Sequence, residues 1–177
     1  MTERTIKHVA AIGAGRMGRG IAHVFAYAGY QVSLVDVKPR SPAEHEALLA
    51  AARVEIEGNL KTLAEFEAFD GSLIPAMLAR INFTADLSDL GDADLIFEGV
   101  TETMEAKEAA FTALNQVVNE DAIIASTTST LPVDKLAAFV DGPARFLNAH
   151  WLNPAFLIPL VEVSPGAATR EDVVDTV

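Results

Sequence analysis

Three glycines, Gly13, Gly15 and Gly18, stand between a short apolar run at 8–12 and a stretch of helical periodicity at 17–28. In a strand–turn–helix unit, the first glycine of this spacing permits a tight turn, the second lets a pyrophosphate approach the backbone, and the third lets helix and strand pack closely. The helix N-terminus adds amide donors and a dipole that favours phosphate. The pattern therefore predicts a parallel α/β sheet with a dinucleotide site at its first turn.

Short β-branched runs alternate with longer helical stretches along the rest of the chain, the pattern of a sheet covered by helices on both faces. Strands are expected at 8–12, 31–36, 81–84, 95–98, 122–125, 145–150 and, introduced by Pro159, at 160–163. Helices are expected at 17–28, 104–118 and 132–139, with one or two more between 42 and 80, broken near 70–71. The predicted fold is a Rossmann-type, doubly wound, mostly parallel α/β sheet with a helical excursion after the second strand.

The end of the second expected strand carries Asp36. A carboxylate there accepts both ribose hydroxyls of an adenosine and repels a 2′-phosphate, which favours NAD over NADP as the cofactor. Lys38 and Arg40 stand close by and could attract that phosphate, so an incomplete preference stays open. A site for S-adenosylmethionine or FAD can use a similar glycine loop and is also a possible reading.

Composition excludes several classes of function. The chain has 177 residues, 25 acidic against 13 basic side chains and a formal charge of -12, so its average field repels nucleic acid. It has no cysteine, which excludes disulfides, thiolate nucleophiles and Cys-ligated metal, and no metal site is expected. No apolar run approaches the roughly 18 residues of a membrane span, and residues 1–4 lack the start of a secretory signal. A cytoplasmic enzyme acting on a small molecule is expected.

Four segments carry a resemblance to a known family. They are GAGRMGRGIA at 13–22, EGVTE at 98–102 with Lys107, ASTTSTL at 125–131, and NAHWLNP at 148–154 with LVEV at 160–163. In this order and spacing they resemble the L-3-hydroxyacyl-CoA dehydrogenases over essentially the whole chain. The resemblance implies NAD-dependent oxidation of a 3-hydroxyl to the 3-keto product by hydride transfer.

The same resemblance implies a catalytic pair. His150 corresponds to the general base that takes the proton of the 3-hydroxyl, a task that suits imidazole because its ordinary pKa lies near neutrality. Glu162 corresponds to the carboxylate that orients the imidazole. Ser129 and Asn153 correspond to polar side chains that hold the substrate oxygens.

The cofactor residues are expected at the glycine loop and beyond it. Besides the three glycines and Asp36, they comprise Arg16 and Met17 within the loop, and Glu102 and Lys107, which correspond to residues near the nicotinamide and its ribose.

Plainer roles compete with these assignments. A histidine in an apolar strand is commonly a hydrogen-bonded core residue, Glu162 between two valines could simply face solvent, and Ser129 could satisfy loop backbone donors. A non-catalytic NAD-binding protein that retains the fold therefore stays an alternative.

The segment at 56–67 departs from the acyl-CoA enzymes, whose helical excursion carries hydroxyl and basic side chains for the nucleotide end of CoA. Asn59 and Lys61 could serve, but the next expected lysine falls near Phe66, between Glu65 and Glu67. An acidic helix repels a polyphosphate and therefore disfavours its binding. Dehydrogenases of small 3-hydroxy acids, such as the L-gulonate and L-carnitine enzymes, stay open beside 3-hydroxyacyl-CoA.

The end of the chain suggests a further domain. Residues 1–168 are expected to form the NAD-binding and catalytic domain, and 169–177 to begin a helix leading into a C-terminal helical domain. By the resemblance, such a domain forms a homodimer and closes over the substrate.

Overall fold

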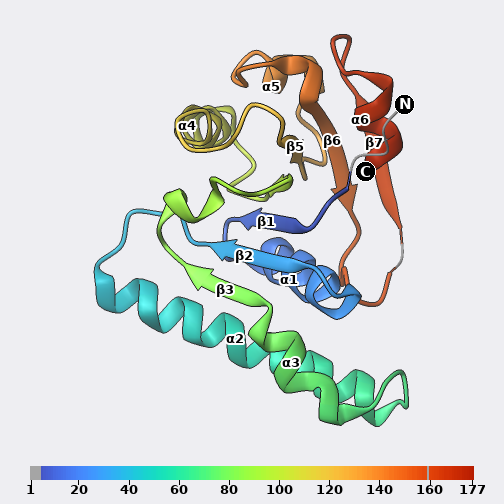
Figure 1. The fold of residues 1–177 in the computed structure, drawn as a ribbon. Helices are drawn as coiled ribbons and strands as arrows, with labels where there is room; N and C mark the ends of the chain where they lie inside the picture. Colours follow the sequence, from blue (N-terminus) through green and yellow to red (C-terminus); the bar gives the residue numbers. More distant parts are fainter. Residues whose placement is uncertain (1–4, 159) are drawn as a thin grey trace.

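A single seven-stranded sheet organises the chain (Figure 1). The computed structural model describes residues 5–158 and 160–177. The strand order is β3-β2-β1-β4-β5-β6-β7, and every neighbouring pair is parallel except β6 and β7. The strands are β1 (His8–Ile12), β2 (Gln31–Val35), β3 (Ile81–Thr84), β4 (Leu95–Glu98), β5 (Ile123–Ser126), β6 (Phe146–Trp151) and β7 (Val161–Pro165). The expected doubly wound sheet is confirmed, and its order reverses between β1 and β4, where such sheets bind ligands.

Helices cover both faces of the sheet, with α1, α2 and α3 on one side and α4 and α5 on the other (Figure 1). The helices are α1 (Arg16–Ala28), α2 (Pro42–Glu65), α3 (Ile74–Ala79), α4 (Met104–Leu114), α5 (Val133–Ala137) and α6 (Glu171–Thr176). Three short 3₁₀ turns, η1 (Gly71–Leu73), η2 (Leu87–Leu90) and η3 (Pro143–Arg145), complete the chain. No helix within 5–158 and 160–177 is long and apolar enough to cross a membrane.

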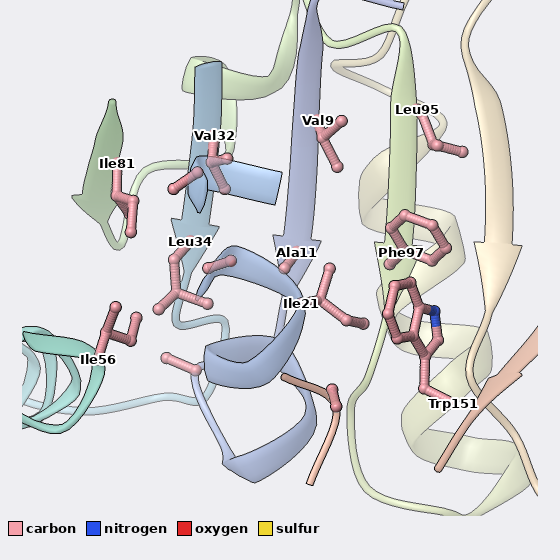
Figure 2. Packing of buried hydrophobic residues seen from close by; sticks show 14 of the residues in the cluster. Val9, Ala11, Ile21, Val32, Leu34, Ile56, Ile81, Leu95, Phe97 and Trp151 are labelled. Atoms are coloured by element: carbon pink, nitrogen blue, oxygen red, sulfur yellow. The ribbon is translucent and has the colours of Figure 1, made fainter. Parts of the chain in front are cut away.

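The core has two parts because side chains alternate across the sheet. Val9 and Ala11 of β1 point into the cluster beneath α1, whereas Ala10 and Ile12 belong to the cluster on the α4 side. Figure 2 shows the first cluster, in which Trp151 of β6 lies close to Phe97 of β4, 5.6 Å between ring centroids. Burial on both faces explains why the central strands β1, β4 and β5 are mostly apolar.

The helical excursion begins at a capping box. The Ser41 hydroxyl accepts a hydrogen bond from the Glu44 amide, and the Glu44 carboxylate accepts one from the Ser41 amide at 2.8 Å. The hydrogen bonds that the Glu44 carboxylate accepts from the amide and the hydroxyl of Ser41 hold its pKa below the ordinary value. The face of α2 that carries Ala52, Ile56 and Leu60 is fully buried, so the excursion packs on the same core as α1. The chain then breaks before η1 and α3, as the sequence predicts near 70–71.

The ends of the elements differ slightly from the sequence-based expectations. Helix α4 ends at Leu114 rather than 118, and β7 covers Val161–Pro165 rather than 160–163. Pro159, expected to introduce that last strand, lies outside the described residues, as do residues 1–4. Helix α6 begins at Glu171, and its Val173 is fully buried in the first cluster. The boundary expected at 168 stays a prediction, although α6 packs on the sheet domain.

Candidate active site

Most of the expected site residues gather at one edge of the sheet. Gly13 follows β1, Asp36 follows β2 and Ser129 lies in the loop after β5, while Glu98 ends β4 and His150 lies near the end of β6. The carboxyl ends of parallel strands meet at the same edge, so the topology alone brings these residues to one side.

The glycine loop has the close contacts that its spacing predicts. Gly13 has a φ of 92°, and a Cβ there would lie 2.6 Å from the carbonyl oxygen of Gly99 after β4. A Cβ at Gly18 would lie 2.1 Å from the carbonyl oxygen of Gly13, so only glycine lets α1 pack this closely. A Cβ at Gly15 would meet nothing within 4 Å. Open space therefore adjoins the backbone at the start of α1, where a pyrophosphate would be held.

Two adjoining cavities fit the adenosine half of a dinucleotide. The first, about 310 Å³, is lined by Gly13, Ala14, Gly15, Arg19, Asp36, Val37, Lys38, Arg40, Leu48, Gly99, Val100 and Thr101. The second, about 250 Å³, is lined by Ile12, Val37, Lys38, Pro39, Leu87, Val100, Thr101, Ala106, Ala109, Ala110 and Ala113. The first cavity, which includes Asp36, Lys38 and Arg40, suits ribose and phosphate, and the second, walled by the alanines of α4, suits a flat base.

Asp36 lines the first of these cavities, and only 3% of its side chain is exposed. Its Oδ2 accepts a hydrogen bond of 2.7 Å from Nε of Arg40, and Nδ1 of His45 lies 3.0 Å from the same oxygen. The carboxylate is therefore at the expected place but already paired. The sequence indicated Arg40 as a neighbour and gave no signal for His45, which reaches Asp36 from α2.

A buried ion pair joins β4 to α4 beneath the site. Both carboxylate oxygens of Glu98 accept hydrogen bonds of 2.9 Å from Nζ of Lys107, and both side chains are almost fully buried. The Ser126 hydroxyl donates to Glu98 at 2.7 Å and the Val100 amide donates at 2.8 Å. Glu98 was not among the expected site residues, although a charged residue ending an apolar strand was a usable signal. Lys107 is enclosed by protein, and its Nζ also contacts the Ser126 hydroxyl at 3.4 Å and Glu102 at 3.3 Å.

Glu102 in turn holds the loop that carries Ser129. Its Oε1 accepts hydrogen bonds from the Thr128 hydroxyl and, at 2.9 Å, from the Ser129 amide. Burial raises the pKa of Glu102, but these hydrogen bonds and the charge of Lys107 outweigh burial and leave the pKa below its ordinary value. An ionised Glu102 thus contacts both Lys107 and Ser129. Through it, the two expected cofactor residues, Glu102 and Lys107, are joined to the expected substrate residue Ser129.

His150 and Glu162 face each other across the antiparallel pair β6–β7. They are register partners, and Nδ1 of His150 lies 2.9 Å from Oε2 of Glu162. The imidazole is partly exposed and the carboxylate mostly exposed, at 29% and 64%. The arrangement leaves Nε2 of His150 available to a ligand, which is what a general base needs.

Arg16 and Asn153 lie together, in a third cavity between α1, α2 and the loop after β6. Arg16 was expected to bind the cofactor, but this cavity does not include Gly13 or Gly15. Met17, by contrast, packs beneath the loop, with its Cβ 3.7 Å from a Cβ built on Gly99.

Comparison with known proteins identifies the family of this chain. The sequence model described as "3-hydroxyacyl-CoA dehydrogenase, NAD binding domain" matches residues 8–177. This chain belongs to that family. The matched part of the family is its NAD-binding domain, which agrees with the glycine loop and the two cavities beside it. The resemblance noted in the sequence is confirmed.

Three relatives show how far the likeness to 3-hydroxyacyl-CoA dehydrogenases extends. A "3-hydroxybutyryl-CoA dehydrogenase" of Bradyrhizobium diazoefficiens is 40% identical over 166 residues, covering 94% of this chain and 54% of that protein. A "5-formyl-3-hydroxy-2-methylpyridine 4-carboxylate 5-dehydrogenase" of Mesorhizobium japonicum is 32% identical over 173 residues, covering 97% and 53%. The crystal structure of FadB2 of M. tuberculosis superposes with a TM-score of 0.89 at 35% identity, covering 98% of this chain and 59% of that one. The chain thus spans about half the length of the curated relatives that it matches.

Proposed function

We propose that this chain carries the NAD-binding and base-catalysis part of a dehydrogenase that oxidises the 3-hydroxyl of a 3-hydroxyacyl-CoA to the 3-keto product. The observation that supports the proposal is the His150–Glu162 pair, held in register across β6 and β7 at 2.9 Å. Relatives named 3-hydroxybutyryl-CoA dehydrogenase support the substrate class. Bound NAD supplies the hydride acceptor.

The side chains of this chain divide the remaining tasks. Glu162 accepts a hydrogen bond from Nδ1–H of His150, which fixes the tautomer whose Nε2 takes the proton of the 3-hydroxyl. The carboxylate also stabilises the imidazolium that forms. Ser129 and Asn153 orient the substrate oxygens. Glu102, fixed by Lys107, holds the Ser129 loop beside the nicotinamide end of the cofactor.

A small 3-hydroxy acid without CoA is the second candidate substrate. One relative is named for a pyridine carboxylate rather than an acyl-CoA. The acidic α2 also favours this candidate, because its Lys61 is paired with Glu57 at 2.6 Å and so offers little net charge to a polyphosphate. Dimer formation through a C-terminal helical domain and a cytoplasmic location belong to the same proposal.

The decisive experiment measures NADH formation by this chain joined to the C-terminal domain of a relative. 3-Hydroxybutyryl-CoA, 3-hydroxybutyrate, L-carnitine and L-gulonate are compared as substrates. His150→Ala should lower kcat by about 10²–10⁴-fold and leave the Kd for NAD unchanged, because the base acts on the substrate and not on the adenosine half. Glu162→Gln should show a smaller loss of the same kind. A His150→Ala variant with near-normal kcat would refute the assignment of His150 as the base, whereas no NADH formation from any of the four substrates would leave a non-catalytic NAD-binding role.

A further inference from the structure

The third cavity, about 320 Å³, lies beside the site at the junction of α1, α2 and the loop after β6. It is lined by Arg16, Gly20, Glu55, Asn59, Asn153, Pro154, Ala155 and Phe156. Asn153 is one of the residues assigned to the substrate, so a ligand in this cavity would be contiguous with the substrate, and none of Gly13, Gly15 and Gly18 lines the cavity.

The loop that closes this cavity is held directly against α1. A Cβ on Gly20 would lie 2.9 Å from Cβ of Ala155, so residue 20 must be glycine for the loop to approach this closely. One turn further along α1, the ring of His23 stacks on Phe156 with centroids 4.9 Å apart and an angle of 6°. These two contacts fix the wall that carries Asn153.

One basic and one acidic side chain line the cavity, and they are not paired with each other. Within residues 5–158 and 160–177, the Arg16 guanidinium makes no hydrogen bond or ion pair, and it is exposed to the cavity and to solvent. The one acid that lines the cavity, Glu55, is already paired with Arg19 of α1. The other polar lining groups are the amides of Asn59 and Asn153. A free guanidinium beside two amides is a receptor for an anionic oxygen group.

We propose that this cavity receives an anionic oxygen group of the substrate, a carboxylate or a phosphate, and that Arg16 binds it. This reassigns Arg16 from cofactor to substrate. The proposal rests on the proposed function because it places a substrate in the cavity. It adds that this dehydrogenase selects substrates bearing an anion beyond the 3-hydroxyl end.

The test is a binding measurement that does not require turnover. Calorimetry on the NADH-loaded protein, which cannot oxidise a 3-hydroxyl, joined to a relative's C-terminal domain, compares four ligands: 3-hydroxybutyrate, its methyl ester, 3-hydroxybutyryl-CoA and 3-hydroxybutyryl-pantetheine. Arg16→Gln should raise the Kd of one anionic ligand about tenfold and leave its uncharged counterpart unchanged. The matched control is Arg53→Gln, which removes the same charge from α2 outside the cavity.

Each outcome has a defined meaning. A loss confined to 3-hydroxybutyrate over its ester identifies a carboxylate as the anion, and a loss confined to the CoA thioester over the pantetheine thioester identifies a phosphate. Equal losses for charged and uncharged ligands, a weaker Kd for NAD, no loss, or no binding of any anion to the unmodified protein would each overturn the proposal. Failure of the proposed function appears separately, as normal turnover in His150→Ala.

Discussion

At the scale of single residues, Asp36 depends on its basic neighbours for its effect on the cofactor. Its carboxylate is paired with Arg40, and Lys38 lines the same cavity. In Asp36→Ser the negative charge is lost, and Arg40 becomes available to a 2′-phosphate. We predict that this variant shifts the ratio of the Kd for NADP to the Kd for NAD by about tenfold or more toward NADP, measured by fluorescence titration.

The unmodified chain should prefer NAD, and Asp36→Ser with Arg40→Ala should lose the gain in NADP affinity. Equal Kd values for NAD and NADP in the unmodified chain would show that the pairing with Arg40 has already cancelled the selectivity expected of Asp36.

His23 makes stability depend on pH. It is buried, neither ring nitrogen has a partner among the described residues, and burial lowers its pKa from 6.5 to about 4. Between these values the unfolded chain binds more protons than the folded one, so the free energy of unfolding falls as the pH falls from 6.5 toward 4. We predict that His23 accounts for a loss of about 2 kcal/mol between pH 7 and pH 5.

Urea denaturation at both pH values tests this prediction in the His23→Phe variant, which keeps an aromatic ring against Phe156. Each protein serves as its own reference at pH 7. If the variant loses as much stability at pH 5 as the unmodified chain, other groups cause the acid sensitivity.

The sequence predicted the residues that belong to a family motif, but not the contacts that join distant segments outside these motifs. His150 and Glu162 were predicted as a pair and lie 2.9 Å apart. His45 and Glu98 escaped prediction because their contacts join distant segments: α2 with β2, and β4 with α4. Arg16 lies in the glycine motif, but its side chain lines another cavity. The spacing of the glycines does not predict the direction of this side chain.

At the scale of elements, the Glu98–Lys107 pair fixes α4 to the end of β4. Replacing Lys107 with Met leaves a buried carboxylate without its counter-charge, which costs about 3–5 kcal/mol. We predict a loss of that size in the free energy of unfolding, measured by urea denaturation. Lys61→Met is the matched control, because Lys61 forms a solvent-exposed pair with Glu57, and such pairs contribute little to stability.

The double variant Glu98→Gln with Lys107→Met removes both charges and should recover part of the stability. A single Lys107→Met variant no less stable than the Lys61→Met control would mean that the buried pair contributes nothing to the attachment of α4.

Short apolar runs predicted the central strands β1, β4 and β5 well because these strands are buried on both faces. The sequence pattern could not predict the direction of β7, since direction depends on how the chain returns to the sheet after β6 and not on the strand's own residues. Periodicity also placed the end of α4 too late. The helix ends at Leu114, and the Asn115 side chain donates a hydrogen bond of 2.9 Å to the carbonyl oxygen of Phe139, a contact 24 residues away that periodicity does not predict.

At the scale of the whole molecule, the chain provides a cofactor site but leaves its substrate side open. Arg16, Asn153 and Glu162 are all exposed. Water at these groups weakens each electrostatic contribution to catalysis. We predict that the 177-residue chain binds NAD but forms NADH efficiently only when a relative's C-terminal domain is supplied in cis or in trans, which a spectrophotometric assay measures. Full turnover by the chain alone would contradict this prediction.

The antiparallel pair β6–β7 separates two properties that an enzyme family must change independently. The proposed base, His150, and its carboxylate, Glu162, are held by backbone register, whereas the loop that lines the proposed substrate cavity connects the same two strands. A change of sequence or length in that loop leaves the pairing of His150 with Glu162 intact. If both proposals hold, new substrates can be acquired during evolution by altering this connection, while the residues for proton transfer are inherited unchanged.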